Sequence, residues 1–122
     1  MVLNIWGYDP NEVGLRQFLG EPELEVLECL WEKGTSVESS RLLKDCRDGK
    51  GKRHSAATIN NSLKSLRERG VVASRVVAHS VPHTEYYAVV MRKELPALLI
   101  GQLLDALSNT MPEEFSKAVK RL

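Results

Sequence analysis

The sequence has few cysteines and no long apolar run, and both absences limit the class of protein. Cys29 and Cys46 are the two cysteines among 122 residues, and their spacing matches neither CxxC nor CxC. We expect reduced thiols that pack as small apolar side chains, and no disulfide framework. No apolar stretch approaches the ~20 residues of a membrane span. Residues 1–14 lack the basic and then apolar layout of a signal peptide, so the expected location is the cytoplasm, without membrane contact.

Catalytic motifs are also missing. The chain contains no HExxH, no phosphate-cradling glycine loop and no nucleophile elbow, and its carboxylates fall on predicted surface helices. His79 and His83 lie in a predicted loop, and we expect no third cysteine or carboxylate ligand beside them. The sequence therefore predicts a protein that is not an enzyme and has neither a cofactor nor a metal site.

Charge is small in total but uneven along the chain. The formal net charge is +1, and 43% hydrophobic with 27% charged residues is typical of one globular domain. Residues 46–93 carry ten Lys or Arg against three Asp or Glu, a net +7, whereas residues 1–45 carry −5 and residues 94–122 carry −1. This basic block is either a solvated face or a surface for phosphate groups.

The order of apolar patterns predicts three helices, a two-stranded hairpin and two more helices. Ser36 and Ser55 are candidate caps of the second and third helices, and Thr110 and Glu113 have capping-box spacing. This order is typical of a winged helix-turn-helix, mainly α with a small β-hairpin, followed by C-terminal dimerisation helices. The predicted helices cover 20–34, 35–46 and 55–70, the strands 71–77 and 84–90, and the last helices 94–109 and 110–122. The predicted divisions are an N-terminal arm at 1–19, a winged helix at 20–91 and a C-terminal helical region at 92–122.

The third helix has an unusual polar face. At 100° per residue, Ile59, Leu63 and Leu66 form its buried side. Asparagine is a poor helix former, so two in succession on the outer side have no obvious structural benefit. Asparagine amides, a small alanine and a lysine are suited to base edges in a DNA major groove, and the alternative is neutral surface. The predicted base-reading residues are Ala57, Asn60, Asn61 and Lys64.

Groups suited to phosphate flank this helix. Ser55 and Thr58 lie in its first turn, where hydroxyls and free backbone N–H groups can bind an anion. The remaining candidates belong to the glycine-containing turn before the helix or to the hairpin, and each of them could instead be an ordinary solvated residue. These candidates are Arg47, Lys50, Lys52, Arg53, Arg75 and His79.

The C-terminal region is more apolar than one intramolecular face requires. Ile100 and Leu104 widen the leucine stripe of the helix at 94–109, which predicts a second burial partner such as another copy of the chain. Packing on the subunit's own domain is the alternative. The predicted dimer-interface residues are Leu95, Leu98, Leu99, Gly101, Leu103, Leu107 and Phe115.

Three segments together resemble the penicillinase-repressor family of transcriptional regulators, which includes methicillin-resistance and copper-responsive repressors. They are "FLGEPELEVLECLWEKG" with its "LECLW" at 27–31, "SAATINNSLKSLRERGVV" and "TEYYAVV". The resemblance covers about residues 15 to 90 clearly. It implies a homodimeric repressor of double-stranded DNA, with a winged helix in each subunit and intertwined C-terminal helices.

The sequence also departs from relatives whose release from DNA is understood. Members relieved by proteolysis are cut at an Asn-Phe pair, whereas here Phe115 follows Glu114. Copper-responsive members carry CxC motifs, and this chain has no cysteine after Cys46. Whether an unknown inducer or a protease releases this protein from DNA therefore stays open. Two alternatives to a repressor are a winged-helix protein-interaction module without DNA binding, and a metal or redox sensor that uses Cys29, Cys46, His79 and His83.

Overall fold

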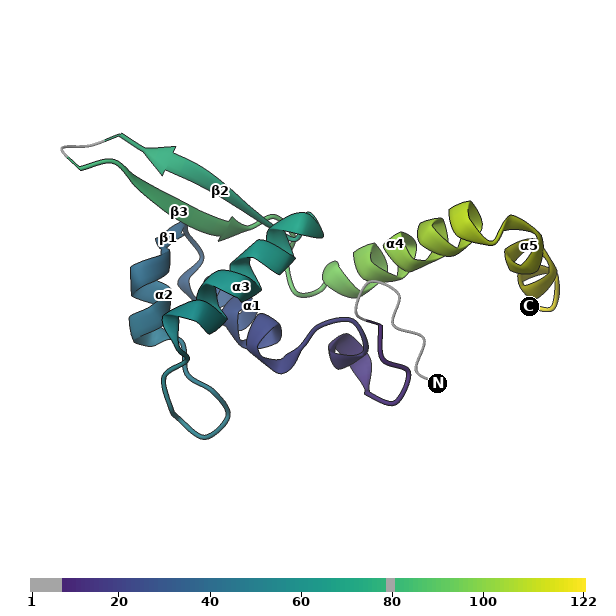
Figure 1. Ribbon diagram of the computed structural model, residues 1–122, viewed down its shortest axis with the longest axis horizontal. Coiled ribbons are helices and arrows are strands. Elements are labelled where there is room, and N and C mark those ends of the chain that lie inside the picture. Colours follow the sequence, from purple (N-terminus) through teal and green to yellow (C-terminus); the bar gives the residue numbers. More distant parts are fainter. Residues whose placement is uncertain (1–7, 79–80) are drawn as a thin grey trace.

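The computed structural model describes residues 8–78 and 81–122 as a mainly helical protein with a small sheet (Figure 1). Three strands form an antiparallel sheet in the order β1-β3-β2. The predicted fold class is confirmed, with a third strand added to the hairpin. In chain order the elements are a 3-10 helix η1 (Gly14–Gln17), α1 (Glu21–Lys33), β1 (Val37–Glu38), α2 (Ser39–Asp45), α3 (Ala56–Glu68), β2 (Val72–Val77), β3 (His83–Ala88), α4 (Leu95–Thr110) and α5 (Pro112–Lys120).

Three helix ends have clear local causes, and one of them, the Ser55 cap, was predicted from the sequence. Gly34 ends α1 in the left-handed conformation, with φ at 67°, and its amide donates to the carbonyl oxygen of Leu30 at 3.1 Å. Ser55 caps α3, because its Oγ accepts a hydrogen bond from the amide of Thr58 at 3.1 Å. Pro96 lies in the first turn of α4, where a missing N–H costs little.

Two predicted caps are wrong. Ser36 does not cap α2, because the next two residues form strand β1 and Glu38 is the N-cap. Ser36 Oγ instead donates to Glu85 Oε1 on β3 at 2.6 Å. Thr110 is the last residue of α4, and its hydroxyl donates to the carbonyl oxygen of Ala106 at 2.7 Å, so no capping box opens α5.

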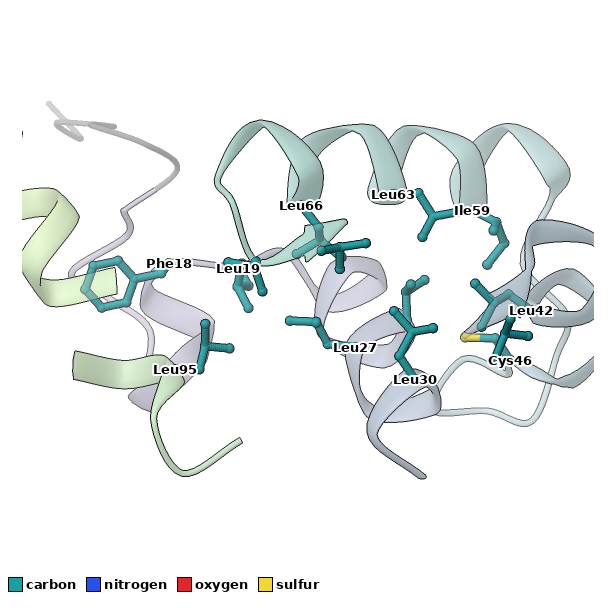
Figure 2. Packing of buried hydrophobic residues seen from close by; sticks show 14 of the residues in the cluster. Phe18, Leu19, Leu27, Leu30, Leu42, Cys46, Ile59, Leu63, Leu66 and Leu95 are labelled. Atoms are coloured by element: carbon teal, nitrogen blue, oxygen red, sulfur yellow. The ribbon is translucent and has the colours of Figure 1, made fainter. Parts of the chain in front are cut away.

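The core is formed where α1, α2 and α3 pack together (Figure 2). Ile59, Leu63 and Leu66 of α3 are each at most 1% exposed, as the helical projection predicted. They face a cluster that includes Leu27 and Leu30 of α1. Full burial of one leucine is worth about 1.5–3 kcal/mol, so this contact fixes the rotation of α3 about its axis. The opposite face of α3 is consequently turned to solvent.

Residues just before α1 and residues in the first turns of α4 also contribute to this core. Phe18 and Leu19, from the end of the predicted arm, are 8% and 2% exposed, and the Phe18 ring lies 5.3 Å from that of Tyr8. These two residues are therefore part of the core and not loosely packed.

Beyond its first turns α4 leads away from the winged helix and carries α5 at its far end (Figure 1). None of the described helices has the length and apolar character to cross a bilayer.

Candidate nucleic-acid interface

The outer face of α3 presents the four residues predicted to read bases. Ala57, Asn60, Asn61 and Lys64 are all exposed, on the side opposite the buried leucines. Within residues 8–78 and 81–122, the side chains of Asn60, Asn61 and Lys64 have no intramolecular hydrogen bond or ion pair. The helix therefore offers amide donors and acceptors and one ammonium group that the fold leaves free for a ligand.

Polar contacts to α1 fix the position of α3. Ser65 Oγ donates to Glu23 Oε2 at 2.8 Å, and Glu23 Oε1 accepts the amide of Gly20 at 3.1 Å. Just before α3, His54 Nε2 lies 3.1 Å from Glu25 Oε1, and both side chains are nearly buried. The contacts of Ser65 with Glu23 and of His54 with Glu25 could not be predicted, because each joins residues far apart in the chain.

The loop between α2 and α3 is a closed turn with a basic surface. Arg47 and Arg53 pair as an antiparallel bridge across it. Asp48 Oδ1 accepts the amides of Lys52 and Lys50 at 2.9 and 2.8 Å, which lowers the pKa of Asp48. Gly51 takes φ of 79°, which favours glycine. In the part of the chain that the structure describes, no ion pair involves Arg47, Lys50, Lys52 or Arg53, and all four are exposed.

The two hydroxyl residues predicted to bind phosphate lie together at the start of α3. Ser55 Oγ lies 2.9 Å from Thr58 Oγ1 and also accepts the Thr58 amide. Ser55 is exposed and Thr58 is half-buried. Their first role is therefore to cap the helix, and the basic loop precedes them directly in the chain.

The wing residues are placed differently from the loop residues. Arg75 on β2 donates from Nη2 to Ser36 Oγ at 2.8 Å and lies 3.3 Å from Glu85 Oε1, with its side chain 61% exposed. Hydrogen bonds from Ser36, His83 and Arg75 lower the pKa of Glu85 to about 2. Arg75 is therefore held on the sheet by a carboxylate and is not a free cation. His79, the other predicted wing contact, lies outside the described residues.

Comparison with known proteins agrees with this arrangement. The sequence model of the penicillinase repressor family matches residues 19–121. The chain belongs to the penicillinase repressor family. Membership supports a DNA-binding regulator of transcription and confirms the resemblance noted from the sequence.

One solved structure has a similar fold. A "possible transcriptional regulator" from Methanosarcina mazei Go1 matches with a TM-score of 0.57 at 13% sequence identity, over 81% of this chain and 78% of that chain. At this identity the likeness concerns the fold alone. The search of curated proteins found no match.

In this member of the penicillinase repressor family, the residues predicted to form a dimer interface divide into two groups. Leu95 and Leu99 are 0% and 2% exposed and belong to the subunit's own core, so these two do not form a free face. They are buried because the first turns of α4 pack against the winged helix, where Gln102 Nε2 also donates to the carbonyl oxygen of Arg69 at 2.7 Å. The half-buried group is Leu98, Gly101, Leu103, Leu107 and Phe115.

Proposed function

We propose that this protein is a sequence-specific transcriptional repressor that binds a two-fold symmetric DNA operator as a homodimer, with α3 in the major groove. The observation that carries the proposal is the outer face of α3. Its three polar side chains, Asn60, Asn61 and Lys64, have no intramolecular partner within the described residues, while the inner face is packed in the core. A repressor acting on DNA works in the cytoplasm of a bacterial or archaeal cell.

Direct readout of bases follows from the chemistry of that face. An asparagine amide matches the N6 donor and N7 acceptor of adenine, and a lysine ammonium group matches the O6 and N7 acceptors of guanine. Ala57 is small enough to contact a thymine methyl group. Each of these side chains is exposed on the same face of a helix whose diameter fits the major groove. We assign the preference of the protein for particular DNA sequences to these four residues.

Phosphate contacts are assigned to the surrounding basic groups. Arg47, Lys50, Lys52 and Arg53 lie in the closed turn before α3, and Ser55 and Thr58 lie at its N-terminus. Such contacts orient a protein on the duplex without reading its sequence. Arg75 in the wing is assigned the same role, and so is His79, which lies outside the described residues. Arg75 would share its guanidinium group between Glu85 and a phosphate.

A homodimer explains the apolar surface of the C-terminal helices. Ile100 and Leu104 of α4 are 47% and 45% exposed, and Met111 and Val119 add further exposed apolar area. A second copy of α4 and α5 would cover these side chains together with the half-buried leucines beside them. Two α3 helices related by a two-fold axis read half-sites about 10 bp apart, or a multiple of it.

Selection of genomic DNA tests the proposal. The purified protein would be mixed with fragments of DNA from its source at moderate salt with excess nonspecific competitor, and the bound fragments sequenced. The matched control is the triple variant Asn60→Ala, Asn61→Ala, Lys64→Ala, which keeps the basic loop. Enrichment of a palindromic promoter fragment by the native chain alone is expected. Equal enrichment by the native chain and the triple variant would refute base readout by α3, and no enrichment by either protein would favour the protein-interaction module.

A further inference from the structure

Three side chains with metal-binding atoms meet on one face of the sheet. His83 and Glu85 are two residues apart on β3, so their side chains lie on the same face. Glu38 on β1 is directly opposite Glu85. His83 Nε2 lies 3.1 Å from Glu85 Oε2 and 3.4 Å from Glu38 Oε1, and one ligand atom from each residue lies within 4.8 Å of the others. The expectation that no carboxylate lies beside His83 is wrong.

The distances between these atoms suit a transition-metal ion. Zn²⁺ binds imidazole nitrogen and carboxylate oxygen at about 2.0–2.2 Å, which places two donors of a tetrahedral site roughly 3.4 Å apart. The two carboxylates balance the charge of a divalent ion. An imidazole ligand favours Zn²⁺ and similar metals over Mg²⁺ and Ca²⁺, which prefer oxygen alone. Three protein ligands leave a further position for water.

Neighbouring groups hold the ligands in the orientation that a metal requires. His83 Nδ1 lies 3.3 Å from the carbonyl oxygen of Val81, so an Nδ1–H donor there leaves Nε2 to bind the ion. Ser36 and Arg75 contact Oε1 of Glu85 at 2.6 and 3.3 Å, which leaves Oε2 on the side of His83. Support of this kind, from outside the ligand set, is typical of protein metal sites.

The surroundings allow an ion to enter. Glu38 and Glu85 line a surface hollow of about 570 Å³ that also exposes Lys33, Arg41 and Lys44. Lys33 and Arg41 already share the Asp45 carboxylate, at 2.7 and 3.5 Å, so one of their two positive charges is balanced. The geometry points to a site for one divalent transition-metal ion, such as Zn²⁺, formed by Glu38, His83 and Glu85. The bound ion ties β1, which leads into α2, to the wing strand β3.

Metal titration of the full chain tests this site without DNA. Protein without an affinity tag, treated with a chelator, would be titrated with Zn²⁺ by calorimetry and with Co²⁺ by visible absorption. One ion per chain is expected. Glu38→Gln and His83→Gln should each weaken Zn²⁺ binding by about 10-fold or more, whereas Glu113→Gln on α5 should leave it unchanged. Far-ultraviolet circular dichroism checks that each variant is folded.

Three results would overturn the site. One is no binding of Zn²⁺ or Co²⁺ to the folded native chain. Another is binding that both Glu38→Gln and His83→Gln leave unchanged. The third is a Co²⁺ spectrum with thiolate charge transfer, which would assign the ion to Cys29 and Cys46. Because none of these measurements uses DNA, they are independent of the proposed repressor function.

Discussion

Replacing Lys52 by alanine should reduce the salt dependence of DNA binding without changing which sequence is bound. Lys52 is exposed in the turn before α3, and it makes no ion pair within the described residues. Its backbone amide, not its side chain, donates to Asp48 Oδ1 at 2.9 Å. Lys52→Ala therefore removes one cation and keeps the hydrogen bonds that close the turn.

The size of the effect follows from counterion release. Each phosphate neutralised on B-DNA contributes about 0.9 to the slope of log K against log salt, so a dimer that loses two Lys52 contacts loses about 1.8. Between about 50 and about 200 mM salt, the native protein should therefore lose roughly 12-fold more affinity than the variant. The ratio of specific to nonspecific affinity should stay the same, because phosphate contacts carry no base information.

Fluorescence anisotropy with operator and scrambled duplexes, repeated over a salt series, measures both quantities. Lys117→Ala is the matched control, since it removes the same charge from α5, at the far end of the molecule from the α2–α3 turn (Figure 1). The control should leave the slope unchanged. Equal slopes for Lys52→Ala and the native chain, or equal losses in the two variants, would refute the assignment of the turn to phosphate binding.

Three further changes test base readout, dimerisation and helix termination. Asn61→Ala should lower discrimination at one base position by about 1–3 kcal/mol in competition binding, and Asn109→Ala should not. Leu104→Glu should convert the dimer to monomer in sedimentation experiments, because a charge would enter an apolar interface, whereas Asn109→Glu should leave a dimer. Gly34→Ala should lower the free energy of unfolding by about 1 kcal/mol in urea, since φ of 67° disfavours a side chain. An unchanged result for Asn61→Ala, Leu104→Glu or Gly34→Ala contradicts the role assigned to that residue.

Features that depend on neighbouring residues in the chain could be predicted from the sequence. The buried face of α3 follows from the 3.6-residue spacing of Ile59, Leu63 and Leu66, and its start follows from the Ser55 hydroxyl. Once the inner face is known, the outer face is known as well. The exposure of Asn60 and Asn61 was therefore predictable, whereas their contact with bases is still a prediction.

Features that depend on pairing between distant segments could not be predicted. Strand β1 is two residues long, too short for any alternation, and it exists because it pairs with Tyr86 and Glu85 on β3. That pairing moves Ser36 from a helix cap to a partner of Glu85. It also brings Glu38 Oε1 within 3.4 Å of Nε2 of His83, which lies 45 positions later in the chain. This separation is roughly that of two ligand atoms on one metal ion. The proposed metal site could not be predicted from the sequence for this reason.

The apolar stripe of α4 could be predicted from the sequence only in part. Its width in the sequence predicted two burial partners, the subunit's own core and a second copy of the chain, but periodicity cannot say which leucine faces which partner. The structure buries Leu95 and Leu99 in the subunit's own core and leaves Ile100 and Leu104 about half exposed. A residue one position along a helix points 100° away, so the first pair and the second pair face different directions. The dimer proposed here must therefore form on the face that carries Ile100 and Leu104, and a charge at Leu104 should separate the subunits without opening the core.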